Sequence, residues 1–150
     1  MATIKQQLFQ LCIEFIDARI ANCENAIAVA NASINEDTKS SAGDKYETSR
    51  EMMTQEIKNN STQLAEAIRQ KQLLLLIHPD KKSDIVQPGS VVYTNQANFF
   101  VAISAGTLKV DGRGYFVLSP SSPLGGQLID KQAGDTVQFN GKAYVIQDVE

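Results

Sequence analysis

Apolar residues in the first half of the chain recur at alternating steps of three and four positions. The series is Ile13, Ile16, Ile20, Cys23, Ile27, Ala30 and Ile34. This spacing places the side chains along one face of a helix and suits a left-handed coiled coil. No Gly occurs before Gly43 and no Pro before Pro79, so nothing in the series breaks a helix. We therefore predict one long amphipathic helix that ends near Asn35.

A second helix is predicted from about Asp44 to Ile77. Its looser apolar stripe comprises Tyr46, Met53, Ile57, Asn60, Leu64, Ala67 and Leu74. The polar stretch 36–43 between the two stripes is typical of a turn. Two long helices joined by a short turn form most simply an antiparallel hairpin. Residues 1–78 are therefore predicted to be a helical hairpin with its tip at about 36–44.

The pattern changes after a linker at 79–84, which begins with a Pro that ends the second helix. Segments rich in β-branched and aromatic residues then predict strands at Val91–Thr94, Phe99–Ile103, Tyr115–Leu118, Thr136–Phe139 and Lys142–Ile146. Gly112-Arg113-Gly114 is read as a turn, and Asn140-Gly141 as a tight hairpin turn. Ser122-Pro123 favours the start of one short helix over 122–129.

The predicted fold class is α+β. An N-terminal antiparallel coiled-coil hairpin is followed, over residues 85–150, by a small antiparallel sheet crossed by one short helix. Hydrophobic residues make up 43% and charged residues 21% of the chain, close to the values of soluble globular proteins. The longest apolar run, Leu73–Ile77, is far shorter than the ~20 residues that span a bilayer. With no secretory signal at the start, we expect a cytoplasmic location and no membrane partner.

Charge and chemistry narrow the function further. The net charge is −3, and no basic face is strong enough to hold duplex DNA. His78 has no nucleophile beside it, and Cys12 and Cys23 lie ~16 Å apart along one helix, too far for a disulfide. One His and two Cys cannot assemble a zinc site. We therefore expect no enzyme activity and no cofactor of the protein's own, and a protein partner for any role in nucleic-acid metabolism.

Two stretches resemble the bacterial Gre transcript-cleavage factors, which act in transcription elongation. Residues 119–137, SPSSPLGGQLIDKQAGDTV, resemble the family's S-x-x-S-P-[ILV]-x-x-x-L-[IL]-G-K-x-x-G-D-x-V signature, with Asp130 where the family usually has Gly. Residues 46–51, YETSRE, resemble its Y-x-x-x-[RK]-E segment. The order of hairpin and sheet module is similar over essentially the whole chain. The resemblance implies an FKBP-like module that docks on RNA polymerase without prolyl isomerase activity, and we assign docking to Ser121, Ser122, Pro123 and Leu124.

In the family, acids at the hairpin tip help hold the second catalytic Mg²⁺ while the polymerase hydrolyses backtracked RNA. The family's acids lie seven and four residues before the Tyr, and here Lys39 and Ala42 stand at those distances from Tyr46. We assign the metal role to Asp37 and Asp44. The alternative metal ligands are Glu36 and Glu47. Asp is also common in turns and caps for backbone reasons alone, which is the competing interpretation of the pair.

The resemblance implies an RNA-polymerase-binding elongation factor. Its hairpin would insert into the secondary channel of core or elongating polymerase and promote cleavage of backtracked RNA, with Mg²⁺ shared with the polymerase active site. Two alternatives stay open: a channel-binding transcription regulator without cleavage activity, and a coiled-coil protein-interaction adaptor. In each case we expect a monomer.

Overall fold

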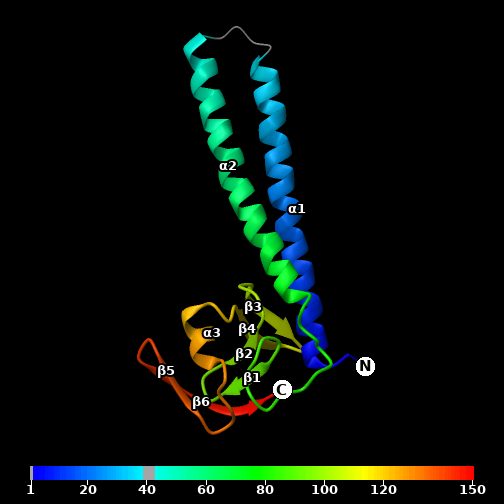
Figure 1. The fold of residues 1–150 in the computed structure, drawn as a ribbon, viewed down its shortest axis with the longest axis vertical. Coiled ribbons are helices and arrows are strands. Elements are labelled where there is room, and N and C mark those ends of the chain that lie inside the picture. The colour runs from blue at the N-terminus through cyan, green and yellow to red at the C-terminus, as the bar shows by residue number, and fades with distance from the viewer. Residues whose placement is uncertain (1, 39–42) are drawn as a thin grey trace. The chain divides into compact units, whose positions relative to one another are not determined.

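The computed structural model describes residues 2–38 and 43–150, and it describes residues 36–38 and 43–48 by their backbone alone. Two long helices precede a six-stranded sheet and one short helix (Figure 1). The elements are α1 (Ile4–Thr38), α2 (Gly43–Leu74), β1 (Val91–Thr94), β2 (Asn98–Val101), β3 (Gly106–Val110), β4 (Arg113–Leu118), α3 (Pro123–Leu128), β5 (Thr136–Phe139) and β6 (Lys142–Val149). The predicted α+β class, with a helical hairpin ahead of a sheet, is confirmed.

The chain divides into two compact units. The hairpin unit is Ile16–Lys71, and the sheet unit combines Met1–Phe15 with Gln72–Glu150. The start of α1 and the end of α2 therefore belong to the same unit as the sheet. The predicted boundary at 79–84 marks the change of sequence pattern, whereas the compact units follow contacts between residues and divide both long helices.

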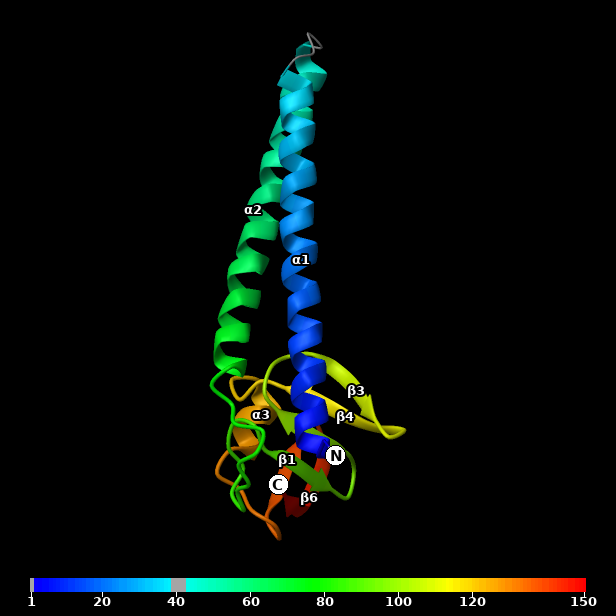
Figure 2. The same ribbon diagram turned by 90° about the vertical axis from the view of Figure 1, so that its right-hand side faces the viewer.

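Within the hairpin unit, α1 and α2 lie side by side and antiparallel (Figures 1 and 2). The predicted stripe of α1 is the face that is shielded from solvent. Its members Ile16, Cys23 and Ala30 are buried, and the three Ile residues between and after them are half-buried. In α2 the corresponding buried or half-buried residues are Met53, Ile57, Asn60, Leu64 and Ala67. The predicted coiled-coil seam is confirmed for the described side chains.

The helix ends differ from the prediction. The backbone of α1 continues to Thr38, past the predicted end at Asn35, and α2 begins at Gly43. The end of an apolar stripe removes packing but not helical hydrogen bonding. Residues 36–38 contain no Gly or Pro that would stop the helix. The predicted turn over 36–43 is therefore too long.

The sheet has the order β3-β4-β2-β1-β6-β5. In the part of the chain that the structure describes, the pairing of β2 with β4 is parallel and the other pairings are antiparallel. The prediction of a purely antiparallel sheet is therefore wrong. The reason is β3, which the sequence analysis missed: it adds one chain reversal between β2 and β4, so that β4 returns beside β2 in the same direction.

β3 and β4 form a hairpin around Asp111 and Gly112. Both residues have left-handed backbones, with φ of 52° and 79°, and Val110 pairs with Arg113. This is the two-residue turn for which Asp-Gly is a strong signal. The predicted turn at 112–114 is wrong because Arg113 and Gly114 already belong to β4. Asn140-Gly141 makes the same kind of turn between β5 and β6, with φ of 50° and 78°, as predicted.

α3 covers one face of the sheet. The core on this face consists of buried apolar side chains from the strands and α3: Val86, Val92, Phe99, Val101, Leu128, Val137, Ile146 and Val149. Strand alternation places Val91, Phe100 and Tyr115 on the opposite face, and these residues are fully buried as well. Both faces of the sheet therefore carry fully buried side chains.

The start of α1 is hydrogen-bonded to the segment that follows α2. Lys5 Nζ donates a hydrogen bond to the Lys81 carbonyl oxygen, and Gln6 Nε2 donates to Asp80 Oδ1. Lys5 is only 5% exposed, and burial lowers its pKa while the Glu150 carboxylate partly opposes that shift. These contacts join residues more than 70 positions apart, and no local pattern in the sequence indicates them.

Candidate functional site

The first candidate site is the start of α3, to which the sequence analysis assigned docking. Ser122 is the N-cap: its Oγ accepts a hydrogen bond from Gly125 N at 3.1 Å and donates one to the Ser119 carbonyl oxygen at 2.6 Å. Pro123 occupies the first helical position, where its missing N–H costs nothing. The predicted helix start is confirmed. It is a rigid corner in which the Ser122 hydroxyl stabilises both the helix and the loop before it.

The four predicted docking residues divide into two pairs. Ser121 and Pro123 are exposed. Ser122 is half-buried and used by the cap, and half-buried Leu124 packs against the core beneath α3. A partner that approaches this corner would therefore meet Ser121 and Pro123.

The loop after α3 uses two left-handed residues. Asp130 has φ of 68° and Gly134 has φ of 96°. Asp130 N donates to the Val86 carbonyl oxygen at 2.9 Å, and Gly134 N donates to the Ile146 carbonyl oxygen at 2.8 Å. These bonds fix the loop on both sides. The left-handed region is adopted readily by Gly and, among other residues, mainly by Asn and Asp, which explains why Asp is tolerated at 130.

The second candidate site is the hairpin tip, where metal binding was assigned to Asp37 and Asp44, with Glu36 and Glu47 as alternatives. All four acids lie on the helix ends next to the turn. Positions 36 and 37 are in the last turn of α1, and positions 44 and 47 are in the first turns of α2. Their side chains lie outside the described part of the structure. Among the described residues, no group of three or more His, Cys, Asp or Glu side chains could hold a metal ion.

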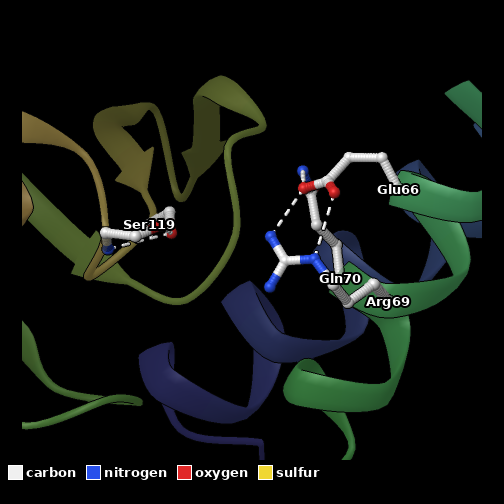
Figure 3. A network of polar contacts seen from close by, with 5 residues as sticks. Glu66, Arg69, Gln70 and Ser119 are labelled. Atoms are coloured by element: carbon white, nitrogen blue, oxygen red, sulfur yellow. Dashed lines mark hydrogen bonds and ion pairs between the residues drawn. The ribbon is translucent and has the colours of Figure 1, made fainter. Parts of the chain in front are cut away.

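Farther along α2, polar contacts organise the hairpin surface. Glu66 accepts hydrogen bonds from Arg69 and Gln70, with the closest Arg69 contact at 2.7 Å (Figure 3). The hydrogen bonds from Arg69 and then from Gln70 lower the pKa of Glu66 to about 2. Lys71 Nζ forms an ion pair with Asp17 Oδ1 at 2.6 Å, which joins α2 to α1 at the end of the seam.

Nucleophiles and bases are not gathered into an active site in the described structure. Cys12 and Cys23 are free and buried, and burial raises the pKa of the Cys12 thiol to about 12. His78 is exposed in the segment that follows α2. Tyr93 Oη donates a half-buried hydrogen bond to Glu150 Oε2 at 3.4 Å, and burial, followed by the Glu150 charge, raises the pKa of Tyr93. A half-buried phenol with a raised pKa stays protonated at neutral pH, so Tyr93 acts as a hydrogen-bond donor.

The sheet unit contains a pocket that the sequence did not predict. Leu73, Leu76 and Ile77 help to line a cavity of 360 Å³ together with residues from the sheet. The run of five apolar residues at 73–77 could have indicated it. A helix that packs along one stripe buries only about half of such a run, so the other residues are left to line a pocket.

Comparison of the chain with protein-family models, with curated proteins and with solved structures finds no match. In the described residues, no helix is both long enough and apolar enough to cross a membrane.

Proposed function

We propose that this protein is an RNA-polymerase-binding factor of the Gre type. Its hairpin would enter the secondary channel and promote cleavage of backtracked RNA by the polymerase active site. The observation that carries the proposal is the agreement between the Gre-like signature at 119–137 and the backbone that these residues adopt.

Four signature positions have a matching structural role. The Ser-Pro pair caps and starts α3. The two positions at which the signature has Gly are 130 and 134, and both have positive φ, where Gly is the residue with least strain. A fortuitous likeness of letters would not need to agree with the backbone in this way. The agreement supports a shared module architecture, and through it the shared partner.

The hairpin supports the same proposal. Within the hairpin unit α1 runs over residues 16–38, which corresponds to about 35 Å of helix at 1.5 Å per residue. Two such helices packed through a narrow seam are thin for their length. This geometry suits insertion into a channel that would exclude a globular domain.

The proposed chemistry at the tip rests on the residue types there. Carboxylate oxygens are the ligands that Mg²⁺ prefers. Asp37 and Asp44 would contribute to holding a Mg²⁺ shared with the polymerase, with Glu36 and Glu47 as the alternatives. The hydrolysis itself belongs to the polymerase, so the proposal assigns this protein no active site of its own.

Binding and cleavage are tested with purified components. The protein should co-elute with bacterial core RNA polymerase and shorten the transcript in stalled, backtracked elongation complexes. Binding without shortening would replace the cleavage function by that of a channel-binding regulator. Absence of binding would refute the polymerase proposal and favour the adaptor interpretation.

The tip is tested by Asp37→Ala and Asp44→Ala, with Glu56→Ala as the matched control. Glu56 is an exposed acid of the same hairpin, well away from the turn. The two Asp variants should lose transcript shortening and keep polymerase binding, while the Glu56 variant should keep both. If the Asp37 and Asp44 variants shorten RNA as well as the unmodified protein, these residues do not hold the metal ion.

A further inference from the structure

The pocket next to the end of α2 is lined entirely by residues of the sheet unit. Its volume of 360 Å³ falls in the range of small-ligand sites. The apolar part of its lining comes from the end of α2, from the turn that follows it and from three segments of the sheet region: Leu73, Leu76, Ile77, Pro88, Ala102 and Pro120.

Two of these side chains are unusually open to solvent. Leu73 is 48% exposed and Leu76 is 72% exposed, although both lie beside a cavity that could shelter apolar atoms. Exposed apolar side chains that adjoin a pocket are typical of binding sites. The apolar lining therefore favours a ligand with a hydrocarbon part.

The polar lining consists of His78, Lys81 and Gln87. Lys81 is a cation and no lining residue is acidic, although the whole chain has a net charge of −3. In the described structure no carboxylate pairs with Lys81 Nζ. The neighbouring carboxylate of Asp80 accepts a hydrogen bond from Gln6.

The backbone around Lys81 is held in place. Its N–H donates to the His78 carbonyl oxygen at 3.1 Å, and its own carbonyl oxygen accepts from buried Lys5. A fixed backbone with an unpaired ammonium group at its side chain is a suitable partner for an anion, because little backbone ordering remains to be done on binding. The positive charge of Lys81 therefore favours an anionic ligand, and the apolar lining favours a hydrocarbon part in the same ligand.

We propose that this pocket binds a small amphiphilic carboxylate. The hydrocarbon chain packs against Leu76, Ile77 and Pro88, and the carboxylate pairs with Lys81. A free small molecule is favoured over a protein segment because the volume of the site falls in the small-ligand range. The inference does not depend on polymerase binding.

The test is isothermal titration calorimetry of the full chain with hexanoate, octanoate and decanoate below their micellar concentrations. We expect one site per chain, with affinity rising about fourfold for each added CH₂ until the pocket is filled. Nonyltrimethylammonium, which has the same alkyl chain as decanoate and the opposite charge, should bind much more weakly. Equal binding of decanoate and nonyltrimethylammonium, or no dependence on chain length, would overturn the proposal.

Variants locate the site. Lys81→Gln should weaken decanoate binding about tenfold, the scale of one charge-assisted hydrogen bond, and Lys109→Gln should leave it unchanged. Lys109 is a matched control because it is an exposed Lys of the same unit that does not line this pocket. Ala102→Leu, checked for folding by circular dichroism, should reduce binding by filling the cavity. Unchanged decanoate binding in Lys81→Gln would refute the pairing of the carboxylate with Lys81. If the pocket bound an acidic peptide and none of the fatty acids, it would be a protein-docking site and the small-ligand proposal would be wrong.

Discussion

Gly125 is the position at which the smallest substitution should have a large effect. A Cβ added there would lie 2.0 Å from the Ser119 carbonyl oxygen, 2.7 Å from Ser122 Oγ and 2.8 Å from Leu118 Cδ1. The first of these atoms belongs to the backbone and cannot rotate away. The shortest ordinary contact for a Cβ is 3.4 Å, against 2.0 Å here. Because the interior is closely packed, the helix and the preceding loop would have to separate by about 1.4 Å to reach it.

That separation breaks the N-cap, because Gly125 N donates to Ser122 Oγ. Loss of a Ser cap costs about 1 kcal/mol, and overpacking costs about 1–3 kcal/mol. The better helix propensity of Ala returns about 0.5–1 kcal/mol. We therefore expect Gly125→Ala to lower the free energy of unfolding by about 2 kcal/mol, combining these contributions.

Gly126→Ala is the matched control in the next position. A Cβ there would meet nothing closer than the Pro120 carbonyl oxygen at 3.6 Å, an ordinary contact. This variant should be stabilised by about 0.5–1 kcal/mol through helix propensity.

Urea unfolding of the full chain measures both variants. Near-UV circular dichroism is the best probe of the sheet unit, because Tyr93, Tyr115 and Tyr144 all lie in its strands. With a slope of about 2 kcal/mol per M, Gly125→Ala should move the urea midpoint down by about 1 M. If the two Ala variants were equally stable, the argument from the Ser119 contact would be refuted.

Three further outcomes are expected. Asp130→Ala should lose about 1 kcal/mol of stability in urea unfolding because φ is positive there, whereas Asp130→Gly should not; equal losses would contradict the backbone argument. The Cys12 thiol, buried and with its pKa raised to about 12, should not react with Ellman's reagent at pH 8 until the protein is unfolded. Glu66 should titrate by NMR near pH 2 and return toward its ordinary pKa in Arg69→Ala. Because its folded pKa is lowered, its stabilising contribution is present above about pH 4.5 and is lost as the pH falls toward 2.

Features that depend on local pattern were predictable from the sequence. The seam of the hairpin follows from the spacing of Ile16, Cys23 and Ala30, because a helix converts spacing directly into a face. The cap at Ser122 and the turn at Asn140-Gly141 follow from residue types with strong backbone preferences. Each of these was confirmed with little change in its boundaries.

Features that depend on pairing across the fold were not predictable in the same way. β3 starts at a Gly and carries Thr and Lys, so its composition is weak for a strand, and it is defined by its pairing with β4. Missing it also reversed the predicted direction of β4 relative to β2. The contact between Lys5 and Lys81 and the pocket beside it are likewise products of tertiary packing, for which the sequence offers only the excess of apolar residues at 73–77.

The start of α3 shows how the structure divides a set of residues that the sequence presents as equivalent. Ser122 and Leu124 already have structural roles, so their substitution should lower both stability and polymerase binding. Ser121 and Pro123 are exposed, and Ala at either position removes little that holds the module together. Docking at this corner therefore requires that Ser121→Ala or Pro123→Ala weaken polymerase binding at unchanged stability, with exposed Gln127→Ala as the control on the same helix. If only the Ser122 and Leu124 variants weaken binding, the resemblance at 119–137 reflects the folding of the module and the docking surface lies elsewhere.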